Sequence, residues 1–321
     1  MIYIGIDVGG MSIKAGAVDE EGNILFKHSC PTGVERGYGA VICDIATLGL
    51  DTIIKSGHTL ADVAAVGIGI PGIMNQQTGV VPFCTNLAWH EVPIIEEMKK
   101  YTDKPVFVDN DANAAALAES VRGVSKGYNS SLFVTLGTGV GGGLIINGRV
   151  FSGAHGVATE IGHMVTVDGG EMCTCGKQGC FERYASATAL IREGRRLCAS
   201  KPECALMQAV NGSILDITAK HVIDLAKSGD PDCTALFDAY IHHLCIGLTN
   251  LINVYDPEII VLGGGVSHAG EFLLNAVRTR MPRYIFFKTM PYARIELAQL
   301  TNDAGIIGAA MLGRTGSPCG Q

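Results

Sequence analysis

The sequence predicts an α/β fold made of two domains. The chain has 321 residues, and at roughly 150 residues per domain this length suits two of them. Short apolar runs typical of buried strands alternate with segments whose apolar residues recur at helical spacing. A strand, a glycine turn and a second strand occur at residues 2–18 and again at 131–150. This repeat indicates a duplicated α/β unit with a cleft between the copies.

The N-terminal half begins as an antiparallel meander. After the strand at 2–8 and its glycine turn, the chain returns as a second strand at 13–18 and a third at 24–26. A dinucleotide-binding loop would lead into a helix instead, so that class of fold is excluded. The following segments are expected to be a helix at 39–56, a strand at 63–70, a helix at 92–101, a strand at 105–108 and a helix at 112–121.

The C-terminal half is mostly helical by its periodicity. We expect helices at 184–200, 217–228, 231–253 and 304–312, a buried strand at 258–262, and a loose tail at 313–321. No linker rich in proline or serine separates the halves, and the domain boundary is expected near residue 119.

Composition excludes several classes of protein. With 24 Lys+Arg against 31 Asp+Glu, the net charge is −7, whereas nucleic-acid binding usually requires a basic face. A hydrophobic share of 47% is enough for a large core. No unbroken apolar stretch reaches the 18 residues of a membrane span, and no signal peptide is visible. We therefore expect a cytoplasmic protein whose clustered cysteines bind a metal in preference to forming disulfides.

Three glycine turns follow predicted strands. They are Asp7-Val8-Gly9-Gly10, Leu136-Gly137-Thr138-Gly139 and Leu262-Gly263-Gly264-Gly265. Each is either a tight hairpin or a loop whose backbone N–H groups bind an anion, and three of them together favour a nucleoside triphosphate. Lys14 adds positive charge near the first turn, and Asp7 is a candidate for holding hydrated Mg²⁺. The G-x-x-x-x-G-K-[ST] phosphate loop does not occur in the sequence.

Two further groups of residues carry chemistry. The run Asp109-Asn110-Asp111-Ala112-Asn113 lies between a strand and a helix, where a carboxylate either caps the helix or accepts a proton from a hydroxyl nucleophile. His163, Cys173, Cys175 and Cys180 match a closed tetrahedral zinc site, which is structural and not catalytic. Three free thiols are the alternative. Such a zinc site would fix the loop that bears Glu160, His163 and Glu182.

The motifs resemble those of one protein family. The run ATEIGH…CTCGKQGCFE is similar to the signature of the ROK family (repressor, open reading frame, kinase). DVGGMSIKAG and TLGTGVGGG look like its two phosphate motifs, and GIGIPG, NLAWHEVP, VDNDANAAALAE and ASATAL resemble its glucokinase branch. The resemblance covers nearly the whole chain. It implies an actin-like (ribonuclease H-like) ATPase fold in which two α/β domains close around sugar and ATP.

The resemblance also implies a domain arrangement and an activity. The C-terminal helix would return to the first domain, so that residues 1–118 and 303–321 form the small domain and 119–302 the large, zinc-binding one. The implied reaction is ATP-dependent phosphorylation of a hexose 6-hydroxyl, converting glucose to glucose 6-phosphate. N-acetylmannosamine or another hexose is the alternative substrate. A non-catalytic sugar sensor and a transcriptional repressor are the alternatives from other classes. The resemblance implies a homodimer or homotetramer.

Roles for individual residues follow from the same resemblance. Asp111 aligns with the base that takes the proton of the sugar hydroxyl. The positions that align with hexose contacts are Asn86, Asn110, Glu160, His163 and Glu182. Those that align with zinc ligands are His163, Cys173, Cys175 and Cys180. The positions that align with nucleotide contacts are Gly9, Gly10, Gly137, Thr138 and Gly264. The glycine turns themselves add Asp7, Lys14 and Gly139 as candidates for holding the nucleotide and Mg²⁺.

Two positions depart from the family pattern. Met11 stands where a threonine is usual, which removes a hydroxyl near the phosphates and bears on ATP affinity. Thr159 replaces a glycine just before Glu160, which would shift the sugar loop and the preferred hexose.

Overall fold

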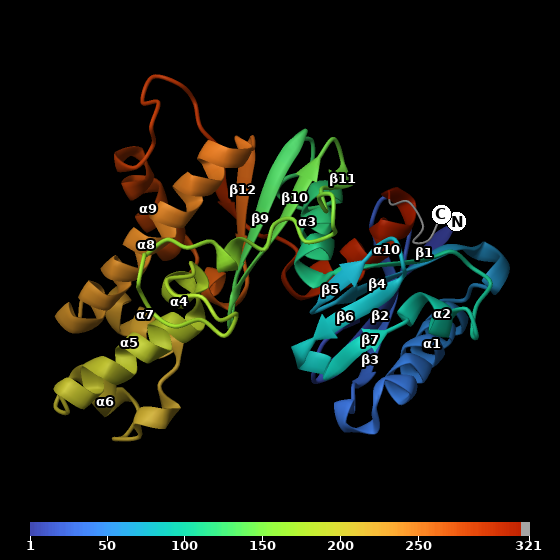
Figure 1. Ribbon diagram of the computed structural model, residues 1–321, viewed down its shortest axis with the longest axis horizontal. Helices are drawn as coiled ribbons and strands as arrows, with labels where there is room; N and C mark the ends of the chain where they lie inside the picture. The colour runs from blue at the N-terminus through green and yellow to red at the C-terminus, as the bar shows by residue number, and fades with distance from the viewer. Residues whose placement is uncertain (316–321) are drawn as a thin grey trace. The chain divides into compact units, whose positions relative to one another are not determined.

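The computed structural model describes residues 1–315 and divides into two compact units (Figure 1). Unit 1 comprises Met1–Phe133, Gly143–Thr159 and the chain from Ala298 onward, and unit 2 comprises Val134–Gly142 and Glu160–Leu297. The expected boundary near residue 119 falls inside a helix of unit 1. Most of the expected loose tail, residues 316–321, lies outside the described residues.

Unit 1 is built on a five-stranded sheet of order β3-β2-β1-β4-β8. Its strands are β1 (Ile2–Val8), β2 (Ser12–Val18), β3 (Ile24–Pro31), β4 (Val63–Ile70) and β8 (Val106–Asn110). β1, β2 and β3 pair antiparallel, while β4 runs parallel to β1 and β8 parallel to β4. The predicted meander is confirmed, and the third strand is longer than its apolar residues alone indicate.

Helices cover both faces of this sheet. Because side chains alternate along a strand, Ile6 of β1 contacts Gly49 of α1 (Tyr38–Lys55), while the neighbouring positions face α10 (Ala304–Thr315). A Cβ on Gly67 would lie 1.7 Å from the carbonyl oxygen of Ala309. Glycine therefore lets α10 rest directly on the strand backbones, and the expected return of the C-terminal helix is confirmed.

The α10 helix also packs against α3 (Asp111–Val121). A Cβ on Gly308 of α10 would lie 1.7 Å from the carbonyl oxygen of Ala114 in α3. The two helices therefore touch backbone to backbone, and the position of α10 fixes the position of α3.

A small sheet that the sequence analysis missed completes unit 1. Its strands, in the order β5-β6-β7, are β5 (Ile73–Asn75), β6 (Val80–Cys84) and β7 (Trp89–Val92). The expected helix at 92–101 was wrong in its bounds, since α2 spans only Ile94–Met98. Trp89 and Val92 are buried on either side of two exposed residues, and their packing into the unit 1 core overrides the helical spacing.

The second five-stranded sheet has the order β11-β10-β9-β12-β13. Its strands are β9 (Ser130–Leu136), β10 (Val140–Ile146), β11 (Arg149–Val150), β12 (Ile259–Gly263) and β13 (Arg294–Leu297). The repeated strand, glycine turn and strand are confirmed at β1–β2 and β9–β10. Both β9 and β10 contain a unit boundary, since β9 ends and β10 begins in unit 2.

Among the described residues, unit 2 holds six α-helices. They are α4 (Glu182–Ala185), α5 (Ala187–Ser200), α6 (Ala205–Ala209), α7 (Ala219–Lys227), α8 (Pro231–Tyr255) and α9 (Glu271–Arg280). The remaining elements of the described chain are short 3-10 helices at Val34–Arg36, Leu60–Asp62, Thr85–Leu87, Ile161–His163, Ile214–Asp216, Gly265–Ala269, Met281–Arg283 and Thr301–Asp303.

The longest helix, α8, is capped and largely internal to unit 2. Asp230 accepts a hydrogen bond from the Cys233 N–H at 2.8 Å, and Pro231 takes the first helical position, which suits its fixed φ. The helix is long and apolar enough to cross a membrane, and 56% of its most apolar window is buried. It packs against α4, α5, α7 and α9, so its apolar face is part of the core of unit 2.

Candidate functional site

The first glycine turn, in unit 1, is closed by main-chain hydrogen bonds. The N–H of Gly9 donates to the Ser12 carbonyl at 2.9 Å, and the Thr32 hydroxyl donates to the Gly9 carbonyl at 2.6 Å. The Thr32 N–H also donates to the Met11 carbonyl at 3.1 Å. The Met11 side chain is 91% exposed. The turn therefore keeps its shape without a hydroxyl at position 11.

Asp7 and Lys14 face each other across β1 and β2. The Lys14 Nζ lies 3.6 Å from a carboxylate oxygen of Asp7. Burial raises the pKa of Asp7, and the charge of Lys14 opposes that rise. A half-buried carboxylate at the end of a strand, next to a loop of backbone N–H groups, is a donor set that suits hydrated Mg²⁺ with phosphate oxygens.

The helix cap after β8 is Asn110 and not a carboxylate. Its Oδ1 accepts a hydrogen bond from the Ala112 N–H at 2.8 Å, and its Nδ2 donates to the Gly72 carbonyl at 3.1 Å. Asp111 is the first residue of α3 and is exposed, and its own Oδ1 accepts from the Ala112 N–H at 2.8 Å. The partial positive charge at a helix N-terminus stabilises an ionised carboxylate there.

Asp109, two residues before Asp111, is only 7% exposed. Its Oδ1 accepts from the Asn110 N–H at 2.7 Å and from Asn113 Nδ2 at 2.9 Å. Burial raises the pKa of Asp109, which these two hydrogen bonds partly offset. Of the two neighbouring aspartates, only Asp111 is accessible to a substrate.

Asn86 lies beside the first glycine turn. It sits in the 3-10 helix Thr85–Leu87 with an exposed side chain. A Cβ on Gly10 would lie 3.0 Å from the Asn86 carbonyl oxygen, so the absence of a side chain at Gly10 lets the two loops touch. Unit 1 thus brings Asn86 to the turn that carries Gly9 and Gly10.

The second and third glycine turns lie together in unit 2. The Gly137 N–H donates to the Gly139 carbonyl at 3.0 Å, and the Thr188 hydroxyl of α5 donates to the Thr138 carbonyl at 2.7 Å. Gly264 has φ +81°, and a Cβ there would lie 2.7 Å from backbone atoms of Leu136. Only glycine fits this close approach with a left-handed backbone.

The four predicted zinc ligands come together in unit 2. The ligand atoms of His163, Cys173, Cys175 and Cys180 all lie within 4.8 Å of one another. Cys175 Sγ is 3.5 Å from Cys180 Sγ, and Cys173 Sγ is 3.7 Å from His163 Nδ1. Tetrahedral ligation with Zn–S bonds of about 2.3 Å separates thiolate sulfurs by about 3.8 Å, so the donor set fits this ion.

Backbone hydrogen bonds hold the cysteine loop in shape before any metal is considered. The Cys173 N–H donates to the Lys177 carbonyl at 2.8 Å, and Lys177 Nζ donates to the His163 carbonyl at 3.0 Å. Burial raises the pKa of Cys180 to about 12. Zinc binds the thiolate form, so ligation would release protons from this loop.

Glu182 connects the cysteine cluster to the second glycine turn. Its Oε1 accepts from Cys173 Sγ at 3.2 Å and lies 4.0 Å from His163 Nδ1. A Cβ on Gly139 would be 2.7 Å from Glu182 Oε2. Sequence spacing alone gave no sign of this contact, because the two motifs lie about forty residues apart.

Glu160 begins the segment that leads to His163. Its side chain is exposed, and the 3-10 helix Ile161–His163 follows. Thr159, directly before it, is buried and has φ +67°. This is the left-handed region that a β-branched residue rarely adopts. Thr159, which stands where the family usually has glycine, is therefore strained, and it lies where the chain passes from unit 1 to unit 2.

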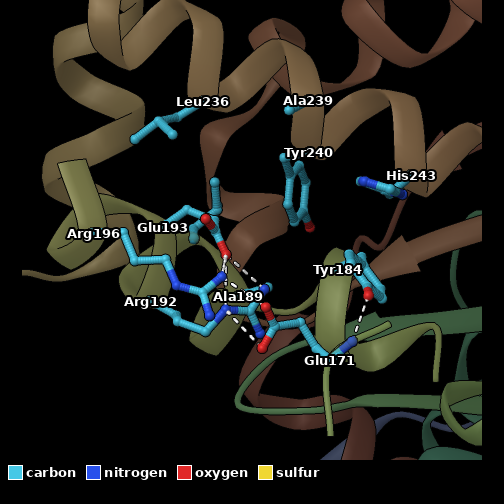
Figure 2. Close-up of a pocket in the computed structure, with 11 residues that line it drawn as sticks. Glu171, Tyr184, Ala189, Arg192, Glu193, Arg196, Leu236, Ala239, Tyr240 and His243 are labelled. Atoms are coloured by element: carbon cyan, nitrogen blue, oxygen red, sulfur yellow. Dashed lines mark hydrogen bonds and ion pairs between the residues drawn. The ribbon is translucent and has the colours of Figure 1, made fainter. Parts of the chain in front are cut away.

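The sequence analysis did not predict an ion-pair network that joins Glu171, two residues before Cys173, to α5 (Figure 2). Arg196 Nη1 of α5 lies 2.7 Å from Glu171 Oε1 and 2.9 Å from Glu193 Oε1. The Glu171 N–H donates to the Tyr184 hydroxyl at 2.7 Å. The hydrogen bond from Arg196 holds the pKa of Glu171 below its usual value. These residues line a pocket of about 280 Å³, and they tie the segment before Cys173 to α5.

The fold and these residues define a class of protein. A duplicated strand, glycine turn and strand, with the C-terminal helix packed on the first sheet, is the architecture of the actin-like ATPase fold. The chain belongs to the ROK family, whose model matches residues 3–315.

Named relatives agree with this assignment. The chain is 38% identical over 313 residues to a glucokinase of Thermotoga maritima, covering 96% of each chain. It is 38% identical over 320 residues to a glucokinase of Streptomyces coelicolor, covering 99% of each. Its structure resembles that of a ROK family glucokinase from Streptomyces griseus in complex with glucose and AMPPNP, with a TM-score of 0.82, 38% identity and coverage of 98% and 99%.

Proposed function

We propose that this protein is a hexokinase-type phosphotransferase that converts glucose and ATP to glucose 6-phosphate and ADP. The observation that carries the proposal is the 38% identity to glucokinases over nearly the full length of both chains. The exposed carboxylate of Asp111 at the start of α3 supplies the group that the reaction needs.

Asp111 is the proposed general base. The oxygen of the sugar 6-hydroxyl forms a bond to the γ-phosphorus, the bond from that phosphorus to the bridging oxygen breaks, and ADP leaves with the electron pair. The hydroxyl proton passes to the Asp111 carboxylate. The partial positive charge at a helix N-terminus favours a carboxylate at this position.

Main-chain groups and Asp7 are assigned to the nucleotide. Phosphoryl transfer depends on positioning and on neutralising charge more than on covalent help from the protein. We assign the glycine turns that carry Gly9, Gly10, Gly137, Thr138, Gly139 and Gly264 to the phosphates, with Lys14 supplying charge. The N–H groups of Gly9 and Gly137 donate within their own turns, so these two residues shape the turns. Asp7 would hold Mg²⁺, which neutralises the phosphate oxygens when bound.

The sugar hydroxyls are assigned to the polar side chains that the family resemblance aligns with hexose contacts. These are Asn86, Asn110, Glu160, His163 and Glu182. A buried hydroxyl must find hydrogen-bond partners, and these residues offer both donors and acceptors. Zinc bound by His163, Cys173, Cys175 and Cys180 would fix the ring of His163 and, through the Cys173 contact, the carboxylate of Glu182.

The cellular setting is proposed from composition and from the family. We expect a homodimer or homotetramer in the cytoplasm that binds neither nucleic acid nor membrane. The net charge of −7 supports the absence of nucleic-acid binding.

The experiment is an assay of ADP release with Mg²⁺-ATP and a panel of sugars: glucose, mannose, fructose, N-acetylglucosamine and N-acetylmannosamine. The expected result is turnover with glucose far above the rest. Preference for an acetylated sugar would keep the reaction class but overturn glucose as substrate. The absence of turnover with every sugar would overturn the kinase assignment and favour a sugar sensor.

A further inference from the structure

Glu119 is a buried carboxylate that the proposed chemistry does not use. It lies on α3, two turns after Asp111, and its exposed fraction is 0%. A charged group out of contact with water is costly unless its oxygens are hydrogen-bonded. The hydrogen-bond partners of Glu119 therefore indicate its structural role.

The described partners of Glu119 are main-chain N–H groups, two from a distant segment and one from the turn just after α3. Its Oε1 accepts from the N–H groups of Gln299 and Leu300, both at 2.9 Å. Its Oε2 accepts from the N–H of Val124, also at 2.9 Å. Hydrogen bonds to an ionised acceptor are about twice as strong as neutral ones. Glu119 thus fastens the end of α3 to residues 299–300.

Residues 299–300 set the start of α10. They lead through the 3-10 helix Thr301–Asp303 into Ala304, the first residue of that helix. Gly305, in the first turn, lies against Asp7: a Cβ there would be 2.5 Å from the Asp7 Cγ. A displacement of the α10 N-terminus therefore reaches the Asp7 carboxylate directly.

We propose that Glu119 is a positioning residue for the Asp7 carboxylate. It holds residues 299–300, these hold the first turn of α10, and Gly305 in that turn confines the Asp7 side chain. The inference rests on the proposed role of Asp7 toward Mg²⁺-ATP. It assigns to Glu119 and Gly305 an effect on metal–nucleotide affinity that is separate from sugar binding.

Two variants perturb the series of contacts from Glu119 to Asp7, one at each end. Glu119→Gln keeps one oxygen but places an NH₂ donor against a main-chain N–H. Gly305→Ala leaves Glu119 intact and inserts a methyl group against the Asp7 carboxylate. Gly313→Ala is the matched control on the same helix, since its Cβ would lie 2.7 Å from the Ala65 Cβ and away from Asp7.

The test measures the affinity of each protein for Mn²⁺–AMPPNP and for glucose by calorimetry, alongside kcat. Loss of a residue that orients a metal ligand weakens metal affinity by about 10–100-fold, so Glu119→Gln and Gly305→Ala should raise the Kd for Mn²⁺–AMPPNP about tenfold. Their Kd for glucose should stay within about twofold of wild type. Gly313→Ala should leave both affinities unchanged.

Two results would overturn the inference. One is an unchanged Mn²⁺–AMPPNP affinity in Gly305→Ala, which decides the matter if Glu119→Gln fails to fold. The other is an equal loss of glucose and nucleotide affinity, which is what a general loosening of unit 1 would give. Failure of the proposed function is seen separately, because the wild-type protein would then show no sugar phosphorylation.

Discussion

Replacing Gly67 by alanine should destabilise unit 1, because α10 rests on the backbone of β4. The new Cβ would lie 1.7 Å from the Ala309 carbonyl oxygen, whereas a carbon and a carbonyl oxygen in contact stay about 3.3 Å apart. The helix must therefore move by about 1.6 Å or the strand must bend. Overpacking of this kind costs about 1–3 kcal/mol, which we expect as the loss in the free energy of unfolding.

The assay is urea unfolding followed by tryptophan fluorescence. The chain has a single tryptophan, Trp89, which is 2% exposed and lies in the unit 1 core, so the signal reports unit 1. Gly49→Ala is the control, because Gly49 lies on α1, which packs against the opposite face of the same sheet. Its Cβ would meet Ile6 Cδ1 at 3.4 Å, an ordinary contact, and glycine to alanine within a helix gains about 0.5–1 kcal/mol.

The reasoning is refuted if Gly67→Ala unfolds at the same urea concentration as wild type. It is also refuted if both variants are destabilised equally, because the backbone contact with α10 would then not be the cause.

Three further outcomes are expected. Asp111→Asn should lower kcat by about 10²–10⁴-fold, the usual contribution of a general base, while calorimetry shows glucose affinity near that of wild type; retained turnover would reject the base. Arg196→Gln should speed transfer of zinc to a chromogenic chelator about tenfold, because it removes the 2.7 Å ion pair of Glu171 before Cys173 and leaves Arg192 at 3.9 Å; the control Lys201→Gln, which breaks a remote ion pair with Asp232, should not. Asp109→Asn should be more stable than wild type at pH 8. The folded pKa of Asp109 is raised, so its ionisation costs stability as the pH rises from the unfolded value of about 3.9 through the folded pKa. The advantage should shrink as thermal unfolding is repeated toward pH 4, and an advantage constant with pH would contradict this cause.

The regular elements were predictable where the local signal was strong. The helix at α1 and the strand at β4 came within one residue of their predicted bounds, because their apolar periodicity is long and uninterrupted. The strands β5, β6 and β7 were missed. They are short, and their stability comes from burying residues such as Trp89 in a core assembled from distant segments.

Some features of the candidate site were likewise predictable from the sequence, and others were not. The ligands of the cysteine cluster were found from the sequence because they lie within eighteen residues and glycines permit the tight loop. The hydrogen bond from the Ala112 N–H to Asn110 is also local, but the sequence analysis had offered a carboxylate as the helix cap. The contact of Glu182 with Gly139 and the hydrogen bonds from residues 299–300 to Glu119 join segments that no spacing rule connects.

By itself, the sequence determined the α/β class, the glycine turns, the candidate metal-ligand set and the family of this protein, because each is carried by short motifs of residue types a few positions apart. Only the tertiary structure decided which aspartate is accessible, that Thr159 is strained at a unit boundary, and that α10 lies against Asp7. Burial and main-chain contact between remote segments decide these features, since they depend on how the whole chain packs and not on local preference.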